Sequence, residues 1–177
     1  PEMPEVDQIA EKSGMQNFVD RVRDIMTSAG ALEANTFYLS SKENLFERMN
    51  VSEEELAEVA NPSSEDQETV RNWLTPSLLK TLHDNRQHSY PQSFFEASEV
   101  VELDDSDVGA SNRQKLAFVK AGNDIDYTDA REILQVLERD LGVQIGVEAS
   151  ERGFANEGRC AELTLDGKKI GFVAQFS

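Results

Sequence analysis

The 177-residue chain contains little of several residue types, and each shortage narrows the possible functions. Its one cysteine, Cys160, excludes an intrachain disulfide and is expected to be a small core residue. Its two histidines, His83 and His88, have no cysteine or acidic partner at zinc-ligand spacing, so no metal site is predicted. No membrane-spanning apolar run or signal-peptide pattern is visible, and we expect a cytoplasmic protein.

Basic residues are scarce as well. The chain has 17 Lys+Arg against 34 Asp+Glu, a net charge of −17. Such a surface repels phosphate backbones, so direct, non-specific binding to nucleic acid is not expected. The charge is compatible with an ordinary acidic cytosolic protein, but we favour adaptation to molar salt, where repulsion is screened within about 3 Å. A domain that melts at the same temperature in dilute buffer and in molar KCl would contradict this halophilic hypothesis.

Arrangements typical of catalysis are missing. Cys160 has no neighbouring histidine, and no Ser-His-Asp arrangement or paired-carboxylate spacing stands out. Glu96, Glu99 and Glu102 lie in a predicted strand, where they alternate between the two faces and cannot form one cluster. We therefore predict no catalytic residue and no cofactor bound by this chain.

The sequence does contain apolar residues at helical spacing. From Gly14 to Ala29 a stripe recurs with the period of a helix: Phe18, Val22, Ile25, Met26 and Ala29. This stripe could pack on the chain's own sheet or on a partner subunit, because both need the same period, and we expect the helix to do both with different sides. Further helices are predicted at 43–49, at 52–59 from the capping pair Ser52 and Glu55, from Pro76 with Thr75 as cap, and from Asp126 or Thr128 to Leu141.

Alternating segments predict strands that come mostly as hairpins. These strands are 33–41, 93–103, 113–122, 143–149, 159–166 and 168–175, the last two joined by the turn Asp166-Gly167. Hairpins with helices between them favour an α+β fold with a largely antiparallel sheet flanked by helices. Residues 1–13 are polar and punctuated by proline, so we predict a linker from an upstream domain, followed by one core domain at 14–177.

These features, in this order, resemble a known family. The helix and strand from Phe18 to Ser41 resemble motif 1 of class II aminoacyl-tRNA synthetases. More specifically, one string resembles the β subunits of phenylalanyl-tRNA synthetases: Asn61-Pro62, Arg71, Leu74-Thr75-Pro76-Ser77-Leu78-Leu79, Asn85 and Phe94-Phe95-Glu96. Segments 126–129 and 158–161 and Gly171 fit the same family, so the resemblance covers roughly residues 1–173.

The resemblance implies the catalytic-like module of a β subunit of archaeal or eukaryotic type, and the charge suggests a haloarchaeal source. Such a module has the class II antiparallel sheet without its chemistry. Its implied role is structural: it packs against the catalytic α subunit of phenylalanine–tRNA ligase, in a heterotetramer with a second β subunit. ATP and magnesium would then be bound by the α subunit, and tRNA only by the whole complex.

Two alternatives remain open at this point. One is a self-standing class II catalytic core, and the other is a stand-alone acidic protein-interaction domain with a synthetase-like fold. Family members usually continue after the strand that contains Gly171, whereas this chain ends at Ala174-Gln175-Phe176-Ser177, so a truncated C-terminus is expected.

The arginines of the chain argue against a catalytic core. Class II enzymes place arginines on the motif 2 strand and in motif 3, because the guanidinium fork fits phosphate oxygens. Here the corresponding strand carries Phe95 and Glu96, and no arginine follows Gly171. Arg71 and Arg159 are therefore predicted to be structural, and the stripe in 14–29 is the predicted subunit interface.

Overall fold

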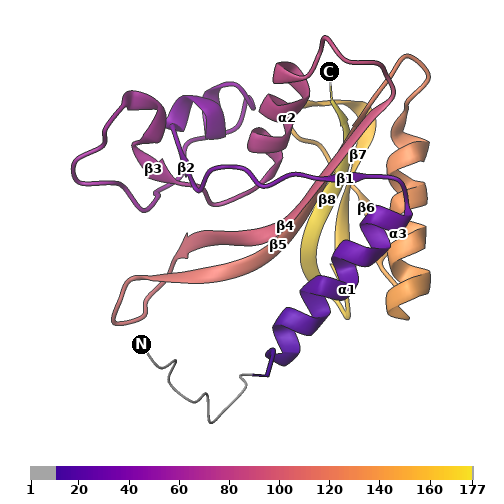
Figure 1. Ribbon diagram of the computed structural model, residues 1–177, viewed down its shortest axis with the longest axis horizontal. Coiled ribbons are helices and arrows are strands. Elements are labelled where there is room, and N and C mark those ends of the chain that lie inside the picture. Colours follow the sequence, from indigo (N-terminus) through magenta and orange to yellow (C-terminus); the bar gives the residue numbers. More distant parts are fainter. Residues whose placement is uncertain (1–10, 177) are drawn as a thin grey trace, which may run out of the picture.

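The computed structural model describes residues 11–176, which form an α+β domain with helices packed against sheets (Figure 1). Its α-helices are α1 (Gly14–Ser28), α2 (Thr75–Asp84) and α3 (Tyr127–Leu141). Its strands are β1 (Leu32–Glu33), β2 (Leu39–Ser40), β3 (Thr69–Val70), β4 (Gln92–Leu103), β5 (Ala110–Ala121), β6 (Gly146–Ala149), β7 (Ala155–Leu165) and β8 (Lys168–Phe176). The predicted α+β class is confirmed, whereas the predicted linker at 1–13 lies mostly outside the described residues.

The strands form three sheets within the described part of the chain. Their orders are β1-β4-β5, β2-β3 and β6-β7-β8. Every pair is antiparallel except β1 with β4, which is parallel. The β4–β5 hairpin pairs residue for residue from Gln92 opposite Ala121 to Leu103 opposite Ala110, and one end of it projects away from the helices (Figure 1).

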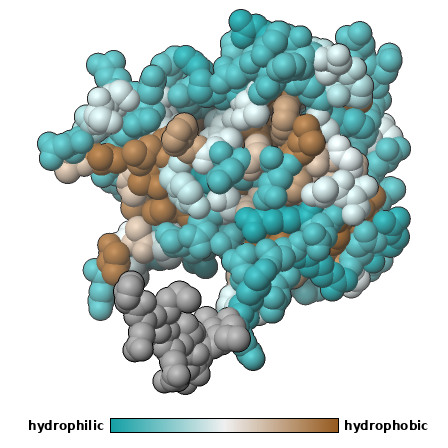
Figure 2. Space-filling model, viewed as in Figure 1, coloured by the Kyte–Doolittle hydropathy of each residue, from teal (hydrophilic) through white to brown (hydrophobic). Residues whose placement is uncertain are grey.

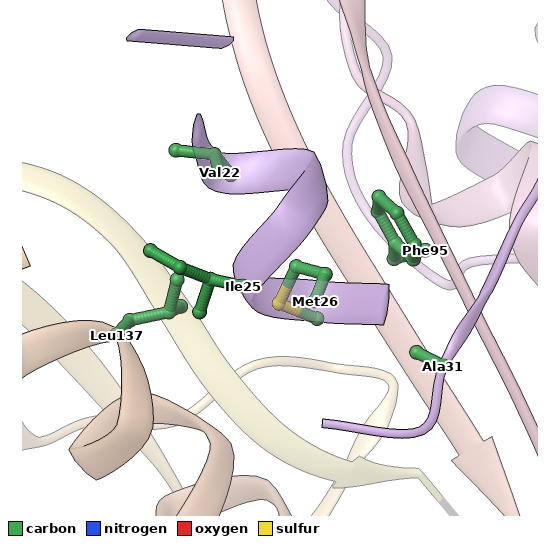
Figure 3. Packing of buried hydrophobic residues seen from close by; sticks show 6 residues of the cluster. All are labelled: Val22, Ile25, Met26, Ala31, Phe95 and Leu137. Carbon is green, nitrogen blue, oxygen red and sulfur yellow. The ribbon is translucent and has the colours of Figure 1, made fainter. Parts of the chain in front are cut away.

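The helices α1 and α3 lie side by side and cover the two three-stranded sheets, whereas the β2–β3 sheet lies away from them (Figure 1). Figure 3 shows the cluster between them, formed by Val22, Ile25, Met26, Ala31, Phe95 and Leu137. A different set of α3 residues, Tyr127, Ala130 and Leu134, packs on the β6-β7-β8 sheet. The helix α3 therefore holds both three-stranded sheets together, because its apolar stripe is wide enough to serve both.

Local signals place most element ends correctly. The side chain of Ser13 accepts a hydrogen bond from the Gln16 N–H at the start of α1. Asp126, one of the two caps considered, forms a capping box with Asp129 at the start of α3. The Asp166-Gly167 turn is confirmed, and both residues have positive φ, as a two-residue hairpin turn of this type requires.

The prediction of one strand at 33–41 was wrong. This segment contains two short strands, β1 and β2, that belong to different sheets. Between them the backbone carbonyls of Thr36, Phe37 and Tyr38 accept hydrogen bonds from Arg71. The side chain of Arg71 thus satisfies the Thr36 and Phe37 carbonyls and its backbone N–H satisfies that of Tyr38, groups that one continuous strand would pair with a neighbouring strand, which interrupts the strand.

Two helix predictions also need correction. Residues 52–59 are not helical; instead Glu58 pairs with Thr69 as an isolated bridge, and Lys42 contacts both Glu53 and Glu58. The helix α2 begins at Thr75, with Leu74 in the capping position and no side-chain cap. The short helix predicted at 43–49 is present as a π-helical segment, Glu43–Glu47, and a 3₁₀ turn, η2, spans Glu65–Gln67.

Candidate functional site

Arg71 is the centre of a buried polar network next to β4. Its side chain is 0% exposed, and its Nη2 donates to Glu96 Oε1 at 2.8 Å and to Ser98 Oγ at 3.0 Å. Its Nη1 donates to Thr36 Oγ1 at 2.6 Å. The Thr36 hydroxyl in turn donates to Glu96 Oε2 at 2.6 Å, which closes the network. Tyr38 completes it, with the guanidinium carbon 4.6 Å from the centre of the Tyr38 ring.

Backbone hydrogen bonds fix where this arginine lies. Arg71 follows β3 directly, and its N–H donates to the Tyr38 carbonyl at 2.9 Å. Its own carbonyl accepts from the Val101 N–H of β4 at 3.0 Å. The residue is therefore held between the segment that follows β1 and the strand β4. These two backbone hydrogen bonds hold Arg71 beside β4, so that its side chain reaches Glu96 of the same strand.

This geometry closes Arg71 to ligands. A phosphate group needs an accessible cation, whereas this guanidinium has no exposed surface and is already engaged by a carboxylate. A buried ion pair is tolerated when further hydrogen bonds compensate its loss of solvent, and here Thr36 bonds to both partners and Ser98 to Arg71, while Arg71 Nε has no partner among the described residues. The arrangement supports the predicted structural role of Arg71.

Arg71 and Glu96 belong to the same sequence motif, but the motif does not indicate that their side chains pair. Nor does it predict Thr36, Tyr38 and Ser98 as partners of Arg71. A signal was available, because Glu96 follows Phe94 and Phe95 in a strand where a buried carboxylate needs a cation. Sequence alone does not say which of the seventeen cations supplies it.

The predicted interface stripe divides into two parts. Val22, Ile25 and Met26 are at most 7% exposed and belong to the chain's own core, as Figure 3 shows. Phe18 is 51% exposed, and Met15 one turn earlier is 57% exposed. These two residues continue the apolar stripe beyond the part that the sheet covers. The first half of α1 therefore offers the accessible part of the predicted interface, and that interface stays a prediction.

The remaining singled-out residues lie apart from this network. Arg159 is exposed in β7, and its side chain has no hydrogen bond or ion pair with any residue between 11 and 176, so the geometry lends its predicted structural role no support. Cys160 is buried, which confirms the expected core position. His83, near the end of α2, contacts Arg86 just after the helix, and His88 lies further along the same loop. No cluster of three or more potential metal ligands occurs among residues 11–176.

A cavity of about 530 Å³ next to Trp73 is also poorly suited to a triphosphate. Three carboxylates line it, from Glu54, Glu55 and Glu102. Its two cations are already paired, Lys115 with Glu102 at 2.5 Å and Arg152 with Glu162 at 3.7 Å. With most of its charge negative, the cavity disfavours a polyanion.

These features define an α+β domain with a closed ion pair on one face of its central hairpin and an amphipathic helix pair on the other. The chain belongs to the family of the phenylalanyl tRNA synthetase beta chain CLM domain, whose model matches residues 1–177. The predicted resemblance to this family is thereby confirmed. No helix in the described part of the chain is long and apolar enough to cross a membrane.

Curated relatives agree with the family match. The chain is 37% identical over 176 residues to the phenylalanine–tRNA ligase beta subunit of Pyrococcus furiosus, covering 99% of this chain and 32% of the relative. It is 36% identical over 165 residues to the subunit of the same name from Methanopyrus kandleri, covering 90% of this chain and 28% of the relative. The chain thus spans about a third of the length of these relatives.

Proposed function

We propose that this chain is a structural and assembly domain of a phenylalanine–tRNA ligase. It packs against the catalytic α subunit and supports the formation of phenylalanyl-tRNA without supplying catalytic residues. The observation that carries this proposal is Arg71, whose guanidinium is enclosed by Glu96 and is inaccessible to a nucleotide phosphate. The family match supplies the reaction to which the domain contributes.

The finer parts of the proposal follow from the family resemblance. The domain has a class II synthetase-like sheet, and the parallel pairing of β1 with β4 beside a long antiparallel hairpin supports that assignment. Two αβ pairs assemble into a cytoplasmic heterotetramer. ATP and magnesium bind to the α subunit, and tRNA binds to the complete assembly.

The accessible half of α1 is the proposed contact with the other subunits. Phe18 carries it, because its side chain is half exposed and lies on the same stripe as the buried core residues. A helix that is buried on one side and exposes large apolar residues at one end fits an interface more readily than bulk solvent.

Two aspartate substitutions in the full-length β subunit test this contact. Phe18→Asp should leave the circular dichroism spectrum and thermal melt intact but weaken binding to the α subunit at least tenfold, measured by light scattering on a size-exclusion column. Val22→Asp places a charge in the core, so it should unfold this domain instead. Normal assembly by a folded Phe18→Asp variant would refute α1 as the contact.

A further inference from the structure

The cavity of about 530 Å³ next to Trp73, called the Trp73 cavity below, lies between segments that are far apart in the sequence. Its wall is formed by residues within 46–55, by Asn72 and Trp73, by residues of β4 and β5, and by residues within 152–154. This volume falls in the range of cavities that bind small organic molecules. Its shape therefore permits a ligand, and its chemistry decides which one.

A close contact between Asn50 and Gly153 holds two walls of the cavity together. Asn50 Nδ2 donates to the Gly153 carbonyl at 2.8 Å. A Cβ atom on residue 153 would collide with the Asn50 carbonyl oxygen, so the approach requires glycine. Their chain neighbours Val51 and Arg152 both line the cavity. The contact thus preorganises the cavity, which lowers the entropy that a ligand loses on binding.

One wall of the Trp73 cavity is aromatic. The rings of Trp73 and Phe154 lie with their centres 6.1 Å apart and their planes tilted by 39°. Trp73 also packs against the buried cluster that contains Leu45 and Phe46. The face of an aromatic ring is electronegative and attracts cations, and that of tryptophan does so most strongly. This wall therefore suits a flat apolar body, a cation, or both in one molecule.

The unpaired polar groups of the wall are mainly hydrogen-bond acceptors. Asn72 Oδ1 is buried and has no hydrogen-bond partner within residues 11–176. The side chains of Glu54 and Glu55 are exposed, and neither has a hydrogen bond or ion pair within the same range. Acceptors are satisfied only by donors, so a ligand that carries N–H groups fits all three.

The cations of the wall do not select an anion. Lys115 is paired with Glu102, and Arg152 is paired with Glu162. Arg152 Nε is the one buried donor of the wall that has no partner in the described part of the chain. It offers a ligand one donor but no net charge, because its guanidinium is already paired. The charges that remain uncompensated in the wall are both carboxylates.

We propose that the Trp73 cavity binds a small organic cation, separately from the α1 contact. Its flat apolar body stacks on Trp73, while its primary ammonium group donates to Asn72 Oδ1 and is attracted by Glu54 and Glu55. The whole surface favours such a ligand: the net charge is −17, and Figure 2 shows hydrophilic residues over most of one face. A negative field of this kind raises the local concentration of cations.

Three indole compounds of similar shape test the charge that the cavity selects. Tryptamine carries an ammonium group, tryptophol a neutral hydroxyl group, and indole-3-acetate a carboxylate. Calorimetry with the full-length β subunit should give a dissociation constant for tryptamine at least about tenfold lower than for tryptophol. Indole-3-acetate should bind more weakly than tryptophol, because the uncompensated charges of the wall are negative.

A matched pair of double variants separates the cavity from the overall charge. Glu54→Gln/Glu55→Gln removes the two carboxylates of the wall and should raise the dissociation constant of tryptamine about fivefold or more, with an unchanged thermal melt. Glu65→Gln/Asp66→Asn also removes two exposed charges, but from the turn η2 outside the wall. This control should change the dissociation constant less than about twofold.

The contact that shapes the cavity is tested with Gly153→Ala. This substitution should weaken tryptamine and tryptophol by the same factor, because it separates two walls and leaves the charges in place. A thermal melt of the variant checks that the domain stays folded. A folded variant that binds both compounds like wild type would show that the cavity between these walls is not the site.

The other outcomes decide the proposal as well. Equal affinities for tryptamine and tryptophol would refute selection of a cation, and tighter binding of indole-3-acetate would reverse it. Equal losses in the two double variants would show that the field of the whole protein, and not the cavity, attracts the probe. If no compound binds the full-length β subunit, another part of that chain fills the cavity or the cavity is no site, and the proposal falls.

Discussion

Phe95 and Glu96 are neighbours in β4, and they show two ways in which this protein builds an interior. Phe95 lies among apolar side chains from α1 and α3, whereas Glu96 faces Arg71 on the opposite side of the strand. Both side chains are almost fully buried, with exposures of 0% and 1%. Adjacent residues on one strand thus belong to an apolar core and to a polar one.

The two interiors differ in what they tolerate. Apolar packing is non-directional and accepts replacements of similar volume. The polar network depends on matched donors and acceptors, so removal of one partner leaves an unpaired charge buried away from water. The stability lost on substitution around Arg71 should therefore depend on whether an unpaired charge remains. The stability lost on substitution around Phe95 should depend on the side-chain volume that is removed.

The largest expected effect comes from breaking the buried pair. Arg71→Met leaves the Glu96 carboxylate without a cation and should lower the free energy of unfolding by about 3–5 kcal/mol. Adding Glu96→Leu removes the stranded charge, so the double variant should regain most of this loss. Urea unfolding of the four proteins of this double-mutant cycle measures both values.

An exposed pair provides the control for this cycle. Arg48 and Glu43 are 2.8 Å apart, with side chains that are 62% and 54% exposed. Arg48→Met should cost less than about 1 kcal/mol, because solvent screens such pairs. A double variant of Arg71 and Glu96 that loses as much stability as the two single variants combined would show that the pair is not coupled.

A similar or slightly smaller effect is expected on the apolar side. Phe95→Ala opens a cavity between α1 and β4 and should cost about 3–5 kcal/mol. Phe37→Ala removes the same atoms from a side chain that is 82% exposed, so it should change stability by less than about 0.5 kcal/mol. Equal losses in the two variants, measured by urea unfolding, would contradict the assignment of Phe95 to the core.

The smallest effect concerns an ion pair at the edge of the apolar side. Lys120 on β5 donates to Asp129 on α3 at 2.6 Å, and this bond, with the Asp126 N–H as a second donor, lowers the Asp129 carboxyl pKa below its usual 3.8. A lowered pKa stabilises the fold above pH 4, and that contribution disappears as the pH falls through the folded-state value.

The melting temperature of Asp129→Asn should therefore fall less between pH 6 and pH 2 than that of the wild type, because the variant has no carboxylate to protonate at this position. The amide oxygen can still accept from the Asp126 N–H, so the helix start is preserved. Asp124→Asn, an exposed acid in the turn before α3, is the control and should leave the profile unchanged. A profile that is as steep in Asp129→Asn as in wild type would exclude this pair as a source of acid sensitivity.

The sequence predicted most of the elements that form the apolar core around Phe95 and few of the contacts in the polar network around Arg71. The helix α1, the β4–β5 hairpin and the helix α3 all follow from apolar period and capping residues, and the structure contains each of them. The error at 33–41 arose because Arg71 competes for the backbone carbonyls of that segment. The error at 52–59 arose because Glu58 pairs with β3 instead of continuing a helix.

The family motif was recognisable because it combines residues within short windows, such as Asn61-Pro62 and the leucine-rich start of α2. The family match confirms that inference. The halophilic hypothesis stays a prediction, because net charge fixes the repulsion but not the salt in which the protein works.

By itself the sequence determined the caps of α1 and α3, the Asp166-Gly167 turn, the helical stripe and the net negative charge, because each depends on composition or on residues close together in the chain. Only the tertiary structure decided that Arg71 binds Glu96 and Thr36, which are 25 and 35 residues away. It also decided that Val22, Ile25 and Met26 are covered while Phe18 and Phe37 are exposed. Periodicity shows that a face is apolar, but what covers that face depends on contacts between distant segments.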